Sequence, residues 1–95
     1  MSPPEFTWDK AKAKLNLAKH GVSFEEAATV FDDLRRLQVI DLHHSEAEER
    51  RFTIGFSYKS RILVVVTYEA EEPFIRIISA RRATAAEIRR YATES

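Results

Sequence analysis

The sequence predicts a single α+β domain, in which two N-terminal helices and a C-terminal helix pack on one side of a four-stranded, mainly antiparallel sheet. Three observations support this prediction: helical spacing of apolar residues in the first third of the chain, strand-like runs in its middle, and a helix-start signal near its end. With 95 residues, of which 44% are hydrophobic, the chain has room for one core. We therefore treat residues 1–95 as one domain, with residues 1–5 as a flexible terminus.

The segment from Asp9 to His20 has the pattern of an amphipathic helix. Four lysines lie mostly outside an apolar stripe with i, i+4, i+7 spacing. The residues expected to be buried in this stripe are Ala11, Leu15 and Ala18. Gly21 follows and is expected to end the helix in a left-handed conformation. Ahead of it, Phe6 to Trp8 is expected to be a short strand or an aromatic anchor, with Trp8 in the core.

Two further helix starts follow, at Ser23 and at Thr84. In each, a hydroxyl residue precedes a glutamate by three positions, at Glu26 and Glu87, which is the spacing of a capping box. The glutamate side chain of such a box reaches back to the backbone of the cap residue. The residues expected to be buried on these two helices are Phe24, Ala27, Ala28, Phe31, Ile88 and Tyr91.

The middle of the chain has the pattern of antiparallel strands. Leu37 to Leu42 is apolar and rich in β-branched residues, as expected of a first strand. Three more runs follow with short connections, from Arg51 to Tyr58, from Arg61 to Glu69 and from Phe74 to Ala80. Because Ile62 to Val66 is apolar at every position, we expect the third of these four strands to be central.

The composition excludes several classes of protein. The absence of cysteine excludes a disulfide framework and thiolate metal sites. No secretory signal and no apolar run of about 20 residues is present, so we expect a cytoplasmic protein with no membrane contact. Fifteen basic and fifteen acidic residues give a net charge of zero, yet Pro73 to Ser95 carries five arginines against two glutamates. A local basic surface is therefore expected on a neutral molecule.

No standard enzyme motif is present: the chain has no phosphate-binding loop, dinucleotide-binding glycines, zinc-protease helix or nucleophile elbow. The three histidines, His20, His43 and His44, lack metal-ligand spacing and a third ligand, so we expect them to be polar surface residues. The sequence therefore predicts no metal site and no cofactor.

The residues best suited to chemistry are arginines near strand ends. Arg50 and Arg51 begin one strand, Arg76 lies inside another, and Arg81 and Arg82 follow its end. A guanidinium group stays charged and donates in a fork that fits two phosphate oxygens, so several arginines on one sheet can hold a phosphodiester. An ion-paired role explains any one of them equally well, except Arg76, whose apolar neighbours make an unused charge costly.

These residues belong to a longer resemblance to the BrnT toxin family, which runs from about Phe6 to Tyr91. It rests on Trp8-Asp9 with Lys12 and Asn16, the run from Lys19 to Ala27, Glu49-Arg50 with Gly55, and the run from Arg76 to Thr84 with Glu87 and Tyr91. One departure is Glu69, where family members often carry a basic residue. This acidic residue weakens the positive field expected for RNA binding.

The resemblance implies a RelE-like fold and toxicity through RNA cleavage and arrested translation. It further implies neutralisation by a BrnA-type antitoxin whose ribbon-helix-helix domain binds operator DNA, so that the toxin meets DNA only through its partner. Because a ribbon-helix-helix antitoxin is itself a dimer, the expected assembly is a hetero-oligomer with two or more toxin copies.

RNA can be cut without a metal ion if an enzyme positions the 2′-hydroxyl, accepts its proton and stabilises the charge on the phosphate. The predicted catalytic residues are Glu49, as base or orienting group, with Arg50, Arg76 and Arg81 as charge-stabilising groups. The predicted RNA-binding residues are Lys19, Arg51 and Arg82. The main alternative is a non-enzymatic binding module or co-repressor whose arginines hold an acidic partner or DNA. A metabolic enzyme fits less well, because no cofactor motif is present.

Overall fold

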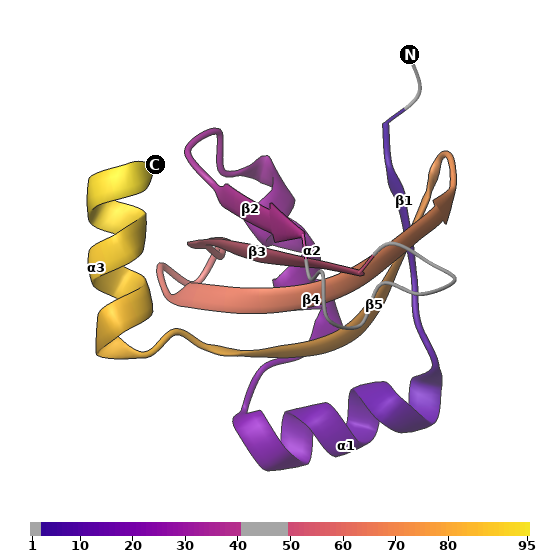
Figure 1. The fold of residues 1–95 in the computed structure, drawn as a ribbon. Coiled ribbons are helices and arrows are strands. Elements are labelled where there is room, and N and C mark those ends of the chain that lie inside the picture. The colour runs from indigo at the N-terminus through magenta and orange to yellow at the C-terminus, as the bar shows by residue number, and fades with distance from the viewer. Residues whose placement is uncertain (1–2, 41–49) are drawn as a thin grey trace.

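The computed structural model describes residues 3–40 and 50–95 (Figure 1). In the described residues a short strand is followed by two helices and a 3-10 turn, then by four consecutive strands and a last helix. The elements are β1 (Glu5–Thr7), α1 (Lys10–His20), α2 (Phe24–Thr29), the 3-10 turn η1 (Val30–Asp32), β2 (Leu37–Ile40), β3 (Arg50–Phe56), β4 (Ile62–Glu71), β5 (Phe74–Arg82) and α3 (Ala85–Glu94). Most predicted boundaries therefore lie within a few residues of the observed ones. Leu42, the predicted end of the first strand, lies outside the described residues.

The described sheet has five strands in the order β1-β5-β4-β3-β2, with β4 at its centre as predicted. Strands β2 to β5 pair antiparallel, but β1 adds to β5 in parallel, with Phe6 beside Ile75. The prediction of four strands is therefore wrong, and the sheet is mixed. Glu5, expected in the flexible terminus, belongs to β1, and its backbone N–H donates to the Pro73 carbonyl (2.9 Å). A strand of three residues is too short to show an alternating pattern.

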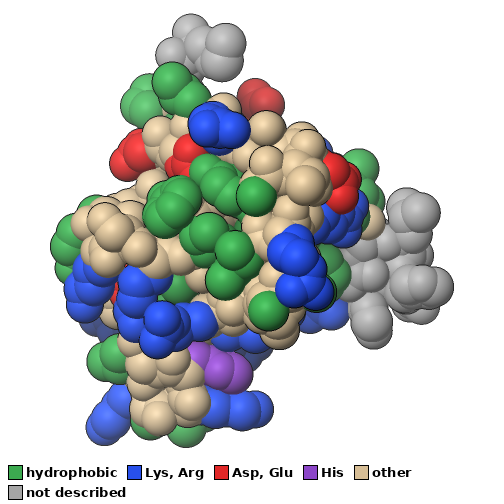
Figure 2. Space-filling view, turned by 90° about the vertical axis from the view of Figure 1, so that its left-hand side faces the viewer, with side chains coloured by type: hydrophobic (Ala, Val, Ile, Leu, Met, Phe, Trp, Pro, Cys, Tyr) green, Lys and Arg blue, Asp and Glu red, His purple; other side chains and the backbone are tan. Residues whose placement is uncertain are grey.

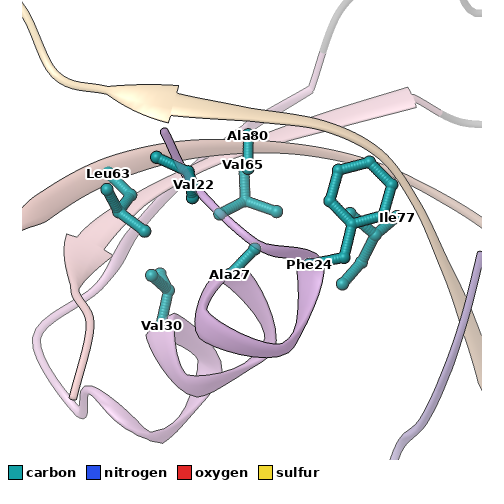
Figure 3. Close-up of a cluster of buried hydrophobic side chains, with 8 residues drawn as sticks. All are labelled: Val22, Phe24, Ala27, Val30, Leu63, Val65, Ile77 and Ala80. Atoms are coloured by element: carbon teal, nitrogen blue, oxygen red, sulfur yellow. The ribbon is translucent and has the colours of Figure 1, made fainter. Parts of the chain in front are cut away.

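The main core lies between the sheet and α2 with its flanking residues (Figure 3). Phe24, Ala27 and Val30 come from α2 and η1, and side chains such as Leu63 and Val65 come from the sheet. The Trp8 ring packs edge-on against Phe24, with 6.0 Å between ring centroids. Trp8 is therefore an anchor for this core, as predicted.

Helix α3 packs against the opposite face, at one end of the sheet (Figure 1). Tyr91 is buried there with Ile54 and Val64, and its ring meets Phe56 edge-on at 5.7 Å between centroids. The Tyr91 hydroxyl donates to the Asp33 carboxylate (2.6 Å). The prediction that all helices lie on one side of the sheet is wrong. Helix α3 follows directly after β5, and Tyr91 completes a second apolar cluster on the other face of the sheet.

Helix α1 lies beside the free edge of β5, and its predicted buried stripe is wrong (Figure 1). Ala11, Leu15 and Ala18 are exposed, and Asn16 is the buried residue of the helix. The Asn16 side chain donates to the Ala80 carbonyl (2.8 Å) and accepts from the Ala80 N–H (3.1 Å). Because a strand edge presents polar backbone groups, the helix meets it with an amide rather than with an apolar stripe.

Candidate active site

The strand register places three of the predicted site residues on one face of the sheet. Tyr68 of β4 lies opposite Arg50 of β3 on one side and opposite Arg76 of β5 on the other. Arg81 lies opposite Val64, which precedes Tyr68 by four residues on β4. Alternate residues of a strand share a face, so all of these point away from the face that α2 covers. We call this the open face, because among the described helices only α3 packs against it, at one end of the sheet.

Arg50, Tyr68 and Arg76 form a row across the three strands. The Arg50 guanidinium lies 5.5 Å from the centre of the Tyr68 ring, within the range of a cation–π contact. With strands about 4.8 Å apart, the Cα atoms of the two arginines are about 10 Å apart across the tyrosine. The row therefore combines two cations for phosphate oxygens with an aromatic ring on which a base can stack. Sequence reasoning missed Tyr68, although pairing the strands on both sides of the turn at Glu72 would have placed it beside Arg76.

Arg76 is exposed, whereas its neighbours Ile75 and Ile77 are buried on the other face. The expectation that apolar neighbours surround this charge is therefore wrong, because a strand alternates between faces. The pKa of Asp9 lies below its ordinary value, chiefly because the Lys12 amide donates to its carboxylate; the charge of Arg76 also contributes. Thr7 of β1 pairs with Arg76, so the row extends towards Asp9, the residue that caps α1.

Arg81 is bound to Glu87 by two hydrogen bonds, of 2.7 and 2.8 Å. The hydrogen bonds from Arg81 are the main reason why the pKa of Glu87 is lowered to about 2. Hydrogen bonds from Thr84 lower it further. The capping box predicted at Thr84 is present, with the Thr84 N–H donating to Glu87 (2.8 Å). Arg81 therefore anchors the start of α3, and both terminal nitrogens of its guanidinium group already donate hydrogen bonds, to Glu87 and to the Arg82 carbonyl.

The remaining predicted residues do not lie with the row. Arg82 lies opposite Leu63 and Arg51 opposite Thr67, both on the covered face. Arg51 forms an ion pair with Glu69 (2.8 Å), which places that unexpected acidic residue on the covered face as well. Lys19 is on α1. Glu49, the predicted base, and two of the histidines, His43 and His44, lie outside the described residues.

The Ser23 hydroxyl accepts from the Glu26 N–H (3.0 Å), so this half of the first capping box is as predicted. The Glu26 carboxylate does not reach back. It is fully buried and accepts hydrogen bonds from Arg61 and from the Ser57 hydroxyl (2.6 Å). Burial alone would raise the pKa of Glu26, but these hydrogen bonds outweigh it and the pKa lies below the ordinary value. We assign this network to stability.

A further exposed surface lies at the end of the molecule where α3 stands. Figure 2 looks onto this end and shows hydrophobic side chains gathered centrally, with Lys and Arg groups on both sides. Its large apolar members include Leu34, Phe56 and Ile88, which are 94%, 44% and 42% exposed. The Asp33 carboxylate links the elements that carry them, because it accepts from the Phe56 N–H (2.9 Å) as well as from Tyr91. We call this surface the apolar end patch.

Within residues 3–40 and 50–95, no three His, Cys, Asp or Glu side chains are placed to hold a metal ion. No helix in the same part of the chain is long and apolar enough to cross a membrane.

An open sheet face that carries two arginines around a tyrosine has the chemistry of a protein that binds phosphate groups and bases. Comparison with known families makes the class specific, because a family model described as "Ribonuclease toxin, BrnT, of type II toxin-antitoxin system" matches residues 8–87. The chain belongs to this family of ribonuclease toxins.

The crystal structure of the ribonuclease toxin BrnT of Brucella abortus has a similar fold, with a TM-score of 0.63. The two chains are 23% identical, and the match covers 85% of this chain and 97% of the Brucella chain. A search of curated proteins finds no match. The expected membership in the BrnT family is thus confirmed.

Proposed function

We propose that this chain is a RelE-like endoribonuclease that cleaves single-stranded RNA on the open face without a metal ion and thereby arrests translation. The observation that carries the proposal is the row of Arg50, Tyr68 and Arg76 across three adjacent strands, in a member of a ribonuclease toxin family. Single-stranded RNA is commonly bound by stacking unpaired bases on aromatic rings while cationic groups hold the backbone.

In the proposed reaction the 2′-hydroxyl oxygen attacks the adjacent phosphorus, and the bond from phosphorus to the 5′-oxygen of the next nucleotide breaks. The products are a 2′,3′-cyclic phosphate and a 5′-hydroxyl, with one proton lost from the nucleophile and one gained by the leaving oxygen. Arg50 and Arg76 stabilise the charge on the phosphate, and Tyr68 positions a base. Glu49, next to Arg50 in the sequence, is the proposed base or orienting group.

Arg81 is proposed to contact a neighbouring phosphate. Arg81 lies opposite Val64 in the sheet, and Val64 is four residues from Tyr68. At about 3.3 Å per residue, Val64 and Tyr68 are about 13 Å apart along β4. The RNA-binding roles of Lys19, Arg51 and Arg82 stay predictions. For Arg51 and Arg82, such contacts would require RNA to pass around the sheet.

The catalytic proposal is tested by Arg76→Ala. Since removing one group aimed at developing charge costs about 10²–10³ in rate, we expect a loss of that size in the cleavage rate. Arg76 is exposed, so its loss leaves the melting temperature nearly unchanged. Arg90→Ala is the matched control, because it removes the same charge from an exposed position on α3 that has no predicted RNA contact.

Cleavage is measured on single-stranded RNA at equal protein concentration. An equal, small effect of both variants contradicts the proposed site. RNA left intact by the wild-type chain favours the alternative of a non-enzymatic binding module.

The metal-free mechanism is tested with a chelator. If guanidinium groups supply the charge stabilisation, excess EDTA leaves the rate of cleavage unchanged. The substrate is an unstructured oligonucleotide, so that chelation does not alter RNA folding. Activity that disappears in EDTA and returns with Mg²⁺ overturns this part of the proposal.

The proposed partner is a BrnA-type antitoxin with a ribbon-helix-helix domain, which covers the open face and links toxin to operator DNA. Membership in a type II toxin–antitoxin family supports an antitoxin partner. The apolar end patch supports a protein partner, because a polyanion does not need apolar surface of this kind. The proposed assembly contains two or more toxin copies.

A further inference from the structure

An open groove of about 590 Å³ lies between α1 and β5. Cationic, polar and apolar side chains line it, and among the described residues no carboxylate does. The lining residues are Lys12, Leu15, Asn16, Ala18, Lys19, His20, Ile78 and Ser79. Leu15 is 69% exposed, so this groove presents apolar surface between positive charges.

The groove follows from how the edge of β5 is covered. Strand β1 pairs with β5 only from Phe74 to Arg76, and α1 reaches the strand through Asn16 at Ala80. Between these points Ile78 is an extra residue, because Ile77 pairs with Thr67 while Ser79 pairs with Val66. Such a bulge redirects side chains. Here Ile78 and Ser79 line the groove, on the edge of β5 beyond the residues that pair with β1.

The groove continues from the open face. Ser79 lines it and also lies between Arg76 and Arg81 on β5, opposite Val66 on the open face. Thr7 of β1 pairs with Arg76, two residues before the Asp9 that caps α1, so the other end of α1 also lies near the arginine row. A strand of RNA held at Arg76 can therefore extend into the groove without crossing a carboxylate among its lining residues.

We propose that this groove is a nucleotide subsite next to the scissile phosphate: Lys12 and Lys19 hold backbone phosphates, and a base lies on Leu15 and Ile78. Lys12 and Lys19 are seven residues apart on α1, about 10.5 Å at about 1.5 Å per residue, with Leu15 between them. The proposal rests on the RNA cleavage proposed above and adds the path of the strand. An acidic peptide also fits the charge, but continuity with the arginine row favours RNA.

The test is charge reversal on the two faces of one helix. Lys12→Glu with Lys19→Glu changes the groove, and Lys10→Glu with Lys14→Glu makes the same charge change outside it. The probe is a fully 2′-O-methylated single-stranded RNA, which binds but lacks the attacking hydroxyl. Circular dichroism and melting temperature confirm that both variants fold.

We expect the groove variant to weaken RNA binding at least tenfold. Loss of two phosphate contacts should also reduce the slope of log Kd against log salt by about 1.4, at about 0.7 per contact on single strands. Leu15→Asp should weaken binding as well, whereas the control pair changes the affinity by less than threefold.

Equal losses in the two charge variants overturn the subsite, because they show a general charge effect. A groove variant with unchanged RNA binding also overturns it, and if that variant has lost its antitoxin instead, the occupant is an acidic peptide. In either case an Arg76→Ala variant that has lost cleavage leaves the proposed function standing. A wild-type chain that neither binds nor cleaves RNA overturns both proposals.

Discussion

Glu26 is a charged side chain with no exposed surface, and it joins three segments of the chain. Its carboxylate lies on α2, while Ser57 and Arg61 flank the turn between β3 and β4. Arg61 also donates to the Gly21 carbonyl (3.1 Å) after α1. A buried carboxylate is costly unless its partners are in place, so this network ties the helical layer to one particular register of the turn.

We expect Glu26→Gln to destabilise the fold by about 3 kcal/mol, the lower end for breaking a buried ion pair, because Arg61 keeps some contact with solvent. Ser57→Ala removes one hydrogen bond to the same carboxylate and should cost about 1.5 kcal/mol. Urea unfolding at pH 7 gives both values. A smaller loss for Glu26→Gln than for Ser57→Ala would show that the ion pair adds nothing.

At the candidate site, sequence reasoning found arginines but not their roles. Arg76 was chosen because of apolar neighbours that turn out to lie on the other face, so the reason for the choice was wrong, and the role of Arg76 stays a proposal. Tyr68 was missed because a lone tyrosine in an apolar strand carries no signal until the strands are paired. Arg81 was identified as a phosphate ligand without its partner Glu87, which lies six residues further along and meets it only when α3 folds back.

Among the elements, α1 shows why a helix can be predicted and its buried side not. The spacing of its apolar residues and the Gly21 stop are sufficient to locate the helix. An apolar stripe predicts the buried side of a helix only when the helix packs on an apolar surface. Helix α1 instead meets the edge of β5, where the Asn16 amide forms hydrogen bonds with the backbone of Ala80. The apolar residues Leu15 and Leu17, which are 69% and 50% exposed, are left outside.

Helix α3 gives a prediction about acid stability. The pKa of Glu87 is about 2 in the folded chain against 4.5 ordinarily, so the unfolded chain binds more protons between these values. The stabilisation from Glu87 is complete above about pH 4.5 and is lost as the pH falls towards 2. Glu26 and Asp33, whose pKa values are also lowered, lose stabilisation in the same direction.

The contribution of Glu87 to stability is the difference in melting temperature between the wild type and Glu87→Gln. We expect Glu87→Gln to lower the melting temperature at pH 7 and to converge with the wild type as the pH approaches 2. Glu94→Gln is the control, since its ion pair with Arg90 is about half exposed and contributes little. Melting curves by circular dichroism from pH 2 to 7 measure this. A constant gap between Glu87→Gln and the wild type across the range would contradict the assignment.

For the whole molecule, the pattern of four antiparallel strands and the central β4 could be predicted because hairpins are local and a central strand is apolar on both faces. The position of β1 could not, because it depends on a contact between residues about seventy positions apart. The division of the helices between two faces is likewise a property of the assembled sheet. That division matters for the proposed function, because α3 packs at one end of the sheet face that carries the arginine row and Arg76 stays exposed there.

A domain of this size is stabilised by only about 5–10 kcal/mol, so a partner that covers its exposed surface changes its stability measurably. An antitoxin present at a thousandfold excess over its dissociation constant adds about 4 kcal/mol to the folded state. At about 4–8 °C per kcal/mol for a domain of this length, the complex should melt about 15–30 °C above the free chain. Calorimetry of the free toxin and the purified complex measures the shift.

The same complex tests whether inhibition acts by covering the site. If an acidic segment of the antitoxin lies on Arg50, Arg76 and Arg81, these guanidinium groups should be protected from phenylglyoxal in the complex, whereas Arg82 on the covered face reacts at a similar rate in both states. Close charge pairs at such an interface mainly slow dissociation, while charges at its rim speed association at low salt. A complex that melts higher yet leaves Arg76 reactive would mean that the antitoxin binds elsewhere. The apolar end patch would then be its site, and inhibition would have to reach the open face through α3, whose first turn is tied to Arg81.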